Sequence, residues 1–147
     1  MTAAATPARA PRVNYGALAE FRYQIRRFVR VSEDAARTTG LEPQQHQLLL
    51  ALKGAPAGAA PTIAWLAERL QLRHHSVVGS VDRLVGRGLV DRRRDPGDQR
   101  RARISLTVTG EEILHRLSMF HQREIRLRAP ALVSAMMAIV RAAPKSR

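Results

Sequence analysis

The sequence predicts a mainly α protein with one small β-hairpin (α+β), and two observations lead to this prediction. Apolar residues in segment 63–87 recur at intervals of three and four, which is typical of two short amphipathic helices. Segment 90–107 then places a Pro-Gly turn before a stretch in which polar and apolar residues alternate, as in a half-buried strand. Two short helices followed by a hairpin form a winged helix-turn-helix, in which the hairpin is the wing.

The two short helices each have one apolar face. The first begins after Thr62, a residue type favoured at N-caps, and three residues link it to the second. Gly88 is expected to end the second helix, because glycine readily adopts the left-handed backbone found there. In a helix-turn-helix the second helix enters the DNA major groove. On the face opposite its apolar stripe, this helix carries Ser76, Ser80, Arg83 and Arg87.

The predicted hairpin is strongly basic. Its turn, Asp95-Pro96-Gly97-Asp98, combines a proline with fixed φ and a glycine that tolerates positive φ. We expect at least one arginine on the inner face of the strands to pair with Asp91 or Asp95. The arginines around the turn are Arg92, Arg93, Arg94, Arg100, Arg101 and Arg103.

Segment 66–107 resembles the MarR family of bacterial transcription regulators. The resemblance rests on three stretches, LAERLQL, SVVGSVDRLVGRGLVDRRRDPGDQRR and ISLTVTG. It implies a homodimer that binds double-stranded DNA at a pseudo-palindromic operator and acts as a ligand-responsive repressor. The alternative is a winged-helix nucleic-acid binder with weak sequence preference or without a response to an effector.

The first half of the second short helix is predicted to contact base edges, as recognition helices do. Arg73 suits guanine, because a guanidinium can donate two hydrogen bonds to O6 and N7. Gly79 lets the helix lie close to the DNA. The family often has a larger polar residue at this position, so the operator sequence does not follow from the resemblance. The predicted DNA contacts of this helix are Arg73, His74, His75, Ser76, Gly79, Ser80 and, toward phosphate, Arg83.

At the hairpin tip, Asp98-Gln99-Arg100 matches the D-x-R pattern of the family. The resemblance implies that Arg100 enters the minor groove and that Asp98 braces the loop or an arginine. A narrow, A·T-rich minor groove concentrates negative potential and attracts arginine, which agrees with that role. Arg101 is expected to bind phosphate.

The chain has the length of a single domain. We expect residues 1–13 to form a disordered tail and residues 14–147 a single MarR-like domain. Within that domain, residues 43–107 would form the DNA-binding lobe, and residues 14–40 and 109–147 would supply the dimerisation helices.

The regions that flank the lobe are predicted to be helical. Residues 15–38 carry an apolar stripe, and Thr109 and Glu112 have the spacing of a capping box, which begins a helix. Pro130 is expected to end that helix, and a last helix would run over residues 132–141. Because this last helix is apolar around much of its surface, a small domain cannot cover it alone. We therefore expect a homodimer, with an ordinary intramolecular bundle as the alternative.

Composition limits the possible partners and compartments. The net charge of +13 predicts a polyanionic partner, either nucleic acid or an anionic membrane surface, and the arginine-rich hairpin favours nucleic acid. The absence of cysteine excludes disulfides, thiolate zinc sites and thiol redox sensing. The sequence shows no signal peptide and no apolar run long enough to span a membrane. We therefore expect a cytoplasmic protein that does not engage the membrane.

Catalytic motifs are missing, so we expect no enzyme, no cofactor and no metal site; the histidines lack ligand spacing. A small aromatic or anionic effector would need a cation and apolar walls near the junction of dimerisation helices and lobe. Each residue with suitable chemistry could also be purely structural. The effector-binding candidates are Arg22, Arg26, His46, Trp65 and His115.

Overall fold

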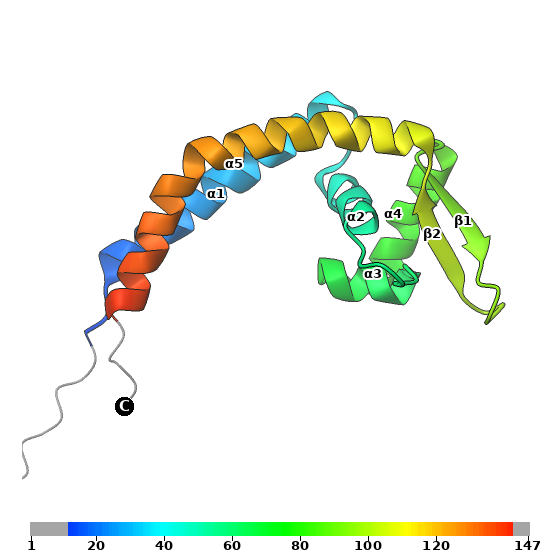
Figure 1. Ribbon diagram of the computed structural model, residues 1–147, viewed down its shortest axis with the longest axis horizontal. Helices are drawn as coiled ribbons and strands as arrows, with labels where there is room; N and C mark the ends of the chain where they lie inside the picture. Colours follow the sequence, from blue (N-terminus) through cyan, green and yellow to red (C-terminus); the bar gives the residue numbers. More distant parts are fainter. Residues whose placement is uncertain (1–11, 143–147) are drawn as a thin grey trace, which may run out of the picture. The chain divides into compact units, whose positions relative to one another are not determined.

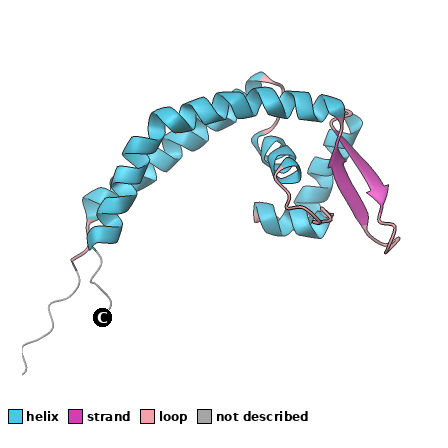
Figure 2. Ribbon diagram, viewed as in Figure 1, coloured by secondary structure: helices cyan, strands magenta, loops and turns pink. Residues whose placement is uncertain are grey.

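The computed structural model describes residues 12–142, which are mainly helical with one hairpin, as predicted (Figures 1 and 2). These residues fall into two compact units: a central unit of residues 31–123, and a terminal unit of residues 12–30 and 124–142. The elements in chain order are α1 (Tyr15–Thr38), α2 (Pro43–Lys53), α3 (Ile63–Leu70), α4 (His74–Gly86), β1 (Val90–Arg94), β2 (Ala102–Leu106) and α5 (Val108–Ala142).

The central unit has a single apolar core. Helices α2, α3 and α4 supply most of it, and the hairpin packs on them, with β1 against α4 and β2 against α2 and α3 (Figure 1). Leu114 and Leu117 of α5 and Ala36 of α1 complete this core. The largest side chains that are fully buried are Leu41, Leu48, Leu49, Leu66, Leu84 and Ile104.

Local capping explains where the two short helices begin and end. The hydroxyl of Thr62 accepts a hydrogen bond from the Trp65 amide at 3.2 Å, so Thr62 caps α3 as predicted. Gly88 follows the end of α4 with φ of 69°, and its amide donates to the Val85 carbonyl at 2.9 Å. A residue with a Cβ is strained in that left-handed conformation, which is why glycine suits this helix end.

The hairpin is a two-stranded antiparallel sheet. Val90 pairs with Leu106 and Arg92 with Ile104, and Val90 and Ile104 are buried against the rest of the central unit. The Ile104 amide also donates to the Pro61 carbonyl at 2.8 Å, which fastens the loop before α3 to β2. One face of the hairpin is therefore fixed to the unit, while the tip between the strands is exposed.

Two predictions about α5 were wrong. The cap is Thr107, whose hydroxyl accepts from the Gly110 amide at 3.0 Å, so the helix begins at Val108, ahead of the predicted cap Thr109. Pro130 does not end the helix, which continues to Ala142. Proline leaves the carbonyl four residues earlier without its helical partner. Both Pro130 and Arg126 are exposed, so water can hydrate that carbonyl and the helix can continue.

The terminal unit has almost no core of its own. Its buried residues within 12–30 and 124–142 are Ala17, Gln24 and Ala135, none of which is a large apolar residue. Although this unit is rich in apolar residues, no helix within residues 12–142 is long and apolar enough to cross a membrane. The large apolar side chains that it exposes are Val13, Tyr15, Leu18, Tyr23, Val29, Ile125, Leu127, Val133, Met136, Met137 and Val140.

Candidate nucleic-acid interface

The start of α4 presents polar side chains to solvent. Arg73 lies at the N-cap, and Arg73, His74 and His75 are exposed, while Ser76 and Gly79 are half-buried. Val77, Val81 and Leu84 on the opposite face are fully buried and hold the helix against the core. The first turn of α4 is thus accessible on a rigidly packed helix, which is the arrangement a recognition helix requires.

The prediction that Ser80 faces DNA was wrong. Ser80 is 2% exposed, and its hydroxyl accepts from Nη2 of Arg83 at 3.3 Å. The reason is helical geometry: position 80 falls three residues after Val77 and four before Leu84, so it lies on the buried face. The Arg83 side chain remains exposed and is free to approach phosphate.

Arg87, the last polar residue predicted on the same face, has a different role. Its Nη1 donates to the carbonyl of Gly40 at 2.7 Å, across 47 residues of sequence. This bond ties the end of α4 to the turn between α1 and α2. Arg87 therefore holds the recognition helix in place within the central unit.

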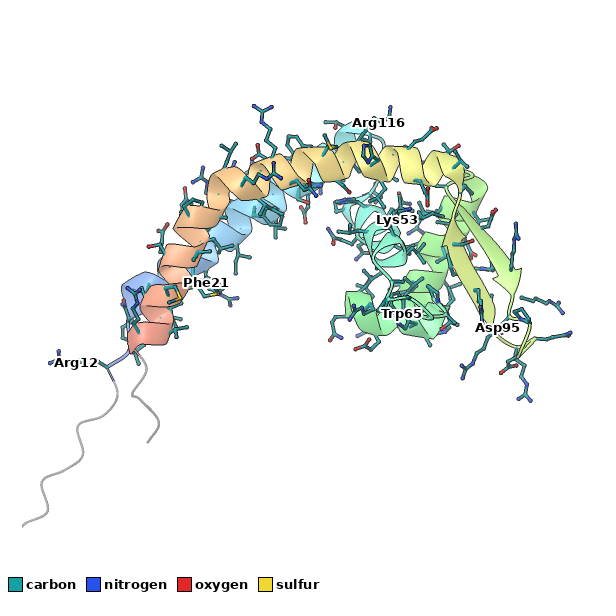
Figure 3. The ribbon with its side chains drawn as sticks, viewed as in Figure 1. Arg12, Phe21, Lys53, Trp65, Asp95 and Arg116 are labelled. Carbon is teal, nitrogen blue, oxygen red and sulfur yellow. The ribbon has the colours of Figure 1, made fainter. Side chains whose placement is uncertain are left out.

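Asp95 organises the base of the wing loop. Its carboxylate accepts from Nε of Arg103 at 2.9 Å and from the Gly97 amide at 2.8 Å, and these two hydrogen bonds lower its pKa. Asp95 pairs with a strand arginine, as predicted, but Arg103 lies on the outer face of the hairpin, not the inner one. The inner-face Arg92 pairs with Asp82 instead. Figure 3 shows Asp95 toward the free end of the hairpin, where side chains point away from the ribbon.

Asp98 braces the wing tip, as the resemblance implied. Its Oδ1 accepts from the Arg100 amide at 3.0 Å, and its Oδ2 lies 3.8 Å from Nε of Arg101. Arg100 itself is exposed, and its guanidinium forms no ion pair within residues 12–142. Arg101 is thus paired with Asp98, whereas Arg100 is free to contact an anionic partner.

A cationic cleft of about 360 Å³ joins the wing to α3 and α4. His74, Arg100 and Arg101 line it, together with Arg92, which was not among the predicted DNA contacts. Arg92 is held by Asp82 of α4 at 2.8 Å. The signal in the sequence was the alternation along β1, which puts Arg92 on the same face as Val90. The cleft offers a phosphate several donors at once.

The predicted effector residues do not share one cavity. Arg22 and Arg26 belong to the terminal unit and are exposed. In the central unit, His46 is buried, Trp65 packs against the core, and His115 lines a shallow pocket on α5. Burial, and secondarily the charge of His121, lower the pKa of His46 to about 4. A neutral, buried His46 is unsuited to binding an anion.

The central unit has a second cavity, larger than the cationic cleft, and none of its lining residues was predicted to bind an effector. Its volume is about 680 Å³, and α1 and α5 form it. Arg116, labelled on α5 in Figure 3, is its one lining cation and forms no ion pair within the described residues. Leu117 and Phe120 supply apolar surface. Within residues 12–142, no group of three or more histidine or acidic side chains could hold a metal ion.

One comparison with known protein families matches the helix-turn-helix and the first part of the wing. The model of the MarR family matches residues 39–101. The match covers less than half of the chain, from the turn after α1 to the wing loop. No curated protein sequence gives a significant match to the chain. The family resemblance drawn from the sequence is confirmed, and MarR-family proteins are transcription regulators, not enzymes.

Solved structures extend the likeness over most of the chain. Wild-type MarR from E. coli has a TM-score of 0.68 at 19% identity, covering 90% of this chain and 98% of that one. A MepR variant from S. aureus, bound to an oligodeoxyribonucleotide, has a TM-score of 0.64 at 21% identity, with coverages of 86% and 98%. PcaV from Streptomyces coelicolor has a TM-score of 0.58 at 26% identity, with coverages of 80% and 87%. The chain thus has the MarR winged-helix fold.

Proposed function

We propose that this protein is a homodimeric, sequence-specific regulator of transcription that binds double-stranded DNA and represses genes beside its operator. The observation that carries the proposal is the wing: Asp98 holds the loop and Arg101, while Arg100 is exposed and unpaired within residues 12–142. A regulator of this kind acts where the DNA is, in the bacterial cytoplasm. The MepR variant bound to an oligodeoxyribonucleotide, which shares the fold, supports DNA as the partner.

Each subunit would contact both grooves. The exposed start of α4, with Arg73, His74 and His75, would enter the major groove, and Arg100 the adjacent minor groove. Arg83 and the cleft arginine Arg92 would bind phosphate. Two recognition helices related by a two-fold axis enter grooves about one turn apart, so the operator is a pseudo-palindrome of roughly 16–20 base pairs.

A direct binding comparison tests the proposal. Duplexes would be selected from a random pool, and anisotropy titrations would compare the selected duplex, a random duplex and single-stranded RNA. We expect the selected duplex to bind at least about 1,000-fold more tightly than the random duplex, as specific regulators do. Equal affinity for the two duplexes would favour the alternative, a winged-helix binder with weak sequence preference. Preference for the RNA would overturn the proposal.

The exposed apolar surface of the terminal unit supports the homodimer. Eleven large apolar side chains are exposed in residues 12–30 and 124–142, while the buried residues are two alanines and a glutamine. So many exposed apolar side chains beside almost no buried ones are costly in water and indicate an interaction site. A second copy of the chain would bury it and would also supply the second recognition helix that a palindromic operator requires.

Leu127→Asp is expected to break the dimer. Leu127 is 67% exposed in the terminal unit, so the substitution leaves the subunit fold intact but places a charge in the proposed interface. Val108→Asp is the matched control, because Val108 is 76% exposed and lies in the central unit. Light scattering after gel filtration should give twice the chain mass of 16.3 kDa for the parent and the control, and one chain mass for Leu127→Asp. A parent protein that stays monomeric at micromolar concentration would contradict the dimer.

The cavity between α1 and α5 supports a response to a small aromatic anion. Arg116 could pair with a carboxylate, while Leu117 and Phe120 would contact an aromatic ring. In a thermal-shift screen of phenolic and aryl-carboxylate compounds, we expect at least one to stabilise the protein and to release the selected duplex. Arg116→Ala should lose both effects and keep DNA binding, whereas Arg37→Ala, an exposed control on α1, should retain them. A hit that is unaffected by Arg116→Ala would place the effector elsewhere.

A further inference from the structure

Two histidines that are 75 positions apart in the sequence form a buried stack between α2 and α5. His46 is 2% exposed and His121 8%. Their ring centroids lie 4.7 Å apart and their planes are inclined by 18°. Phe120 meets His121 edge-on, with centroids 5.6 Å apart. The stack lies where α2, which supports the helix-turn-helix, meets α5.

Neither ring has its hydrogen-bonding capacity satisfied. Nε2 of His46 and Nε2 of His121 are both buried and have no partner among the described residues. A buried polar atom without a partner costs free energy, so a purely structural contact would be better made by apolar rings. The rings are nearly parallel and their lone pairs lie in the ring planes, so the two nitrogens do not converge on a single metal ion. The remaining chemistry of the pair is proton uptake.

The charged groups of the surrounding helices offer an imidazolium no partner. On α1, Glu33 and Asp34 pair with Arg37, and at the start of α2 the Glu42 carboxylate caps the helix. On α5, Glu111 pairs with Lys53 and Glu124 with Arg128. The remaining charged or titratable groups of α5 near the pair are Glu112, His115, Arg116 and Arg123, all of which are exposed.

We propose that the His46–His121 stack is an acid-sensitive clasp, in which proton uptake separates the rings, loosens α2 from α5 and weakens DNA binding. The step to DNA binding rests on the function proposed above. A proton on either ring would bury a charge that faces a second imidazole across 4.7 Å, with no carboxylate to offset it. Opening the contact lets water solvate that charge.

Linkage gives the direction and size of the effect. In the closed stack the pKa of His46 is about 4, and a solvated histidine has its ordinary pKa near 6.5. Between these values the open form binds more protons, so the open population grows as the pH falls from 6.5 toward 4 and is constant above about 7. From pH 7.5 to pH 5.0, the ratio of open to closed protein should rise about 30-fold through His46 alone.

Hydrogen–deuterium exchange on the full chain without DNA tests the clasp. We expect protection over residues 43–53 and 117–124 to fall by about 30-fold between pH 7.5 and pH 5.0, after correction for intrinsic exchange. The double variant His46→Phe/His121→Phe keeps an aromatic pair but binds no proton, so it should lose this response. His115→Gln, an exposed histidine of the same helix, is the control and should behave like the parent. An identical pH response in parent and double variant would overturn the clasp.

Two further measurements keep the proposal testable. If the double variant is unfolded at pH 7.5, the imidazole NMR signal of His46 in the parent decides: we expect it to titrate well below pH 6, and titration of this signal near pH 6.5 would refute the clasp. Anisotropy with the selected duplex at both pH values then tests the coupling. Parent affinity should fall at least 10-fold more than that of the double variant, and an equal fall would refute the coupling. If the parent protein did not bind the selected duplex at pH 7.5, that result would instead count against the proposed function.

Discussion

Gly110→Ala is expected to destabilise the protein by about 3 kcal/mol or more, because the new methyl group would overlap backbone atoms. A Cβ at this position would overlap the carbonyl oxygen of Leu89 and would lie 3.4 Å from the Leu106 side chain. That carbonyl cannot simply move away, since it accepts a hydrogen bond from the Thr107 amide at 3.1 Å. The close approach holds the start of α5 against the strand that begins the wing.

Urea denaturation followed by circular dichroism measures this effect. Gly86→Ala is the matched control, because its Cβ would meet nothing within 4 Å and alanine favours helix. We expect the control to be neutral or more stable than the parent by up to about 1 kcal/mol. If Gly110→Ala unfolded at the same urea concentration as the parent, the contact between Gly110 and Leu89 would not exist as described.

Arg100→Ala is expected to lower affinity for the selected duplex by about 1–3 kcal/mol, which is roughly 5- to 150-fold. Arg100 is exposed and unpaired within residues 12–142, so little intramolecular contact is lost and the cost falls on DNA binding. Arg100→Lys should recover only part of the loss, since an ammonium keeps the charge but not the planar fork of donors. Anisotropy titration at fixed salt measures both variants.

Two controls separate this effect from a general loss of charge. Arg37→Ala removes an exposed arginine that already pairs with Glu33 and Asp34. The affinity of this variant for the selected duplex should equal that of the parent. Arg101→Ala removes the wing arginine beside Asp98, so we expect an intermediate loss. Should Arg100→Ala bind as tightly as Arg37→Ala, the wing tip would not contact DNA.

Features set by short-range patterns could be predicted from the sequence. The predicted helix over 15–38 matches α1, and the predicted cap Thr62 is where the structure has it. Pro96 and Gly97 lie in the loop between the strands, as predicted, but the hydrogen-bonded turn follows them, where the Arg101 amide donates to the Asp98 carbonyl at 3.0 Å. A pairing of Asp95 with a strand arginine was also predicted, although the arginine is Arg103 on the outer face of the hairpin and not one on the inner face. These features depend on residues close in sequence or opposed in one hairpin, so local geometry suffices to predict them.

Features that depend on competing contacts could not be predicted. Ser80 is an exception, because its spacing from Val77 and Leu84 already indicated the buried face, and its polarity alone led to the wrong prediction. Thr107 and Thr109 are both plausible caps, and only the contact of Gly110 with Leu89 selects the first. The His46–His121 stack joins two helices that are distant in the sequence, and no local pattern reports it.

A hydroxyl-radical footprint of the parent protein on its selected duplex tests the central claim most directly. The account predicts protected blocks arranged with two-fold symmetry about one turn apart, flanked by minor-groove protection that disappears in Arg100→Ala while the central blocks remain. The account would be contradicted if saturating protein gave no symmetric protection of the duplex. It would also be contradicted if the flanking protection persisted in Arg100→Ala.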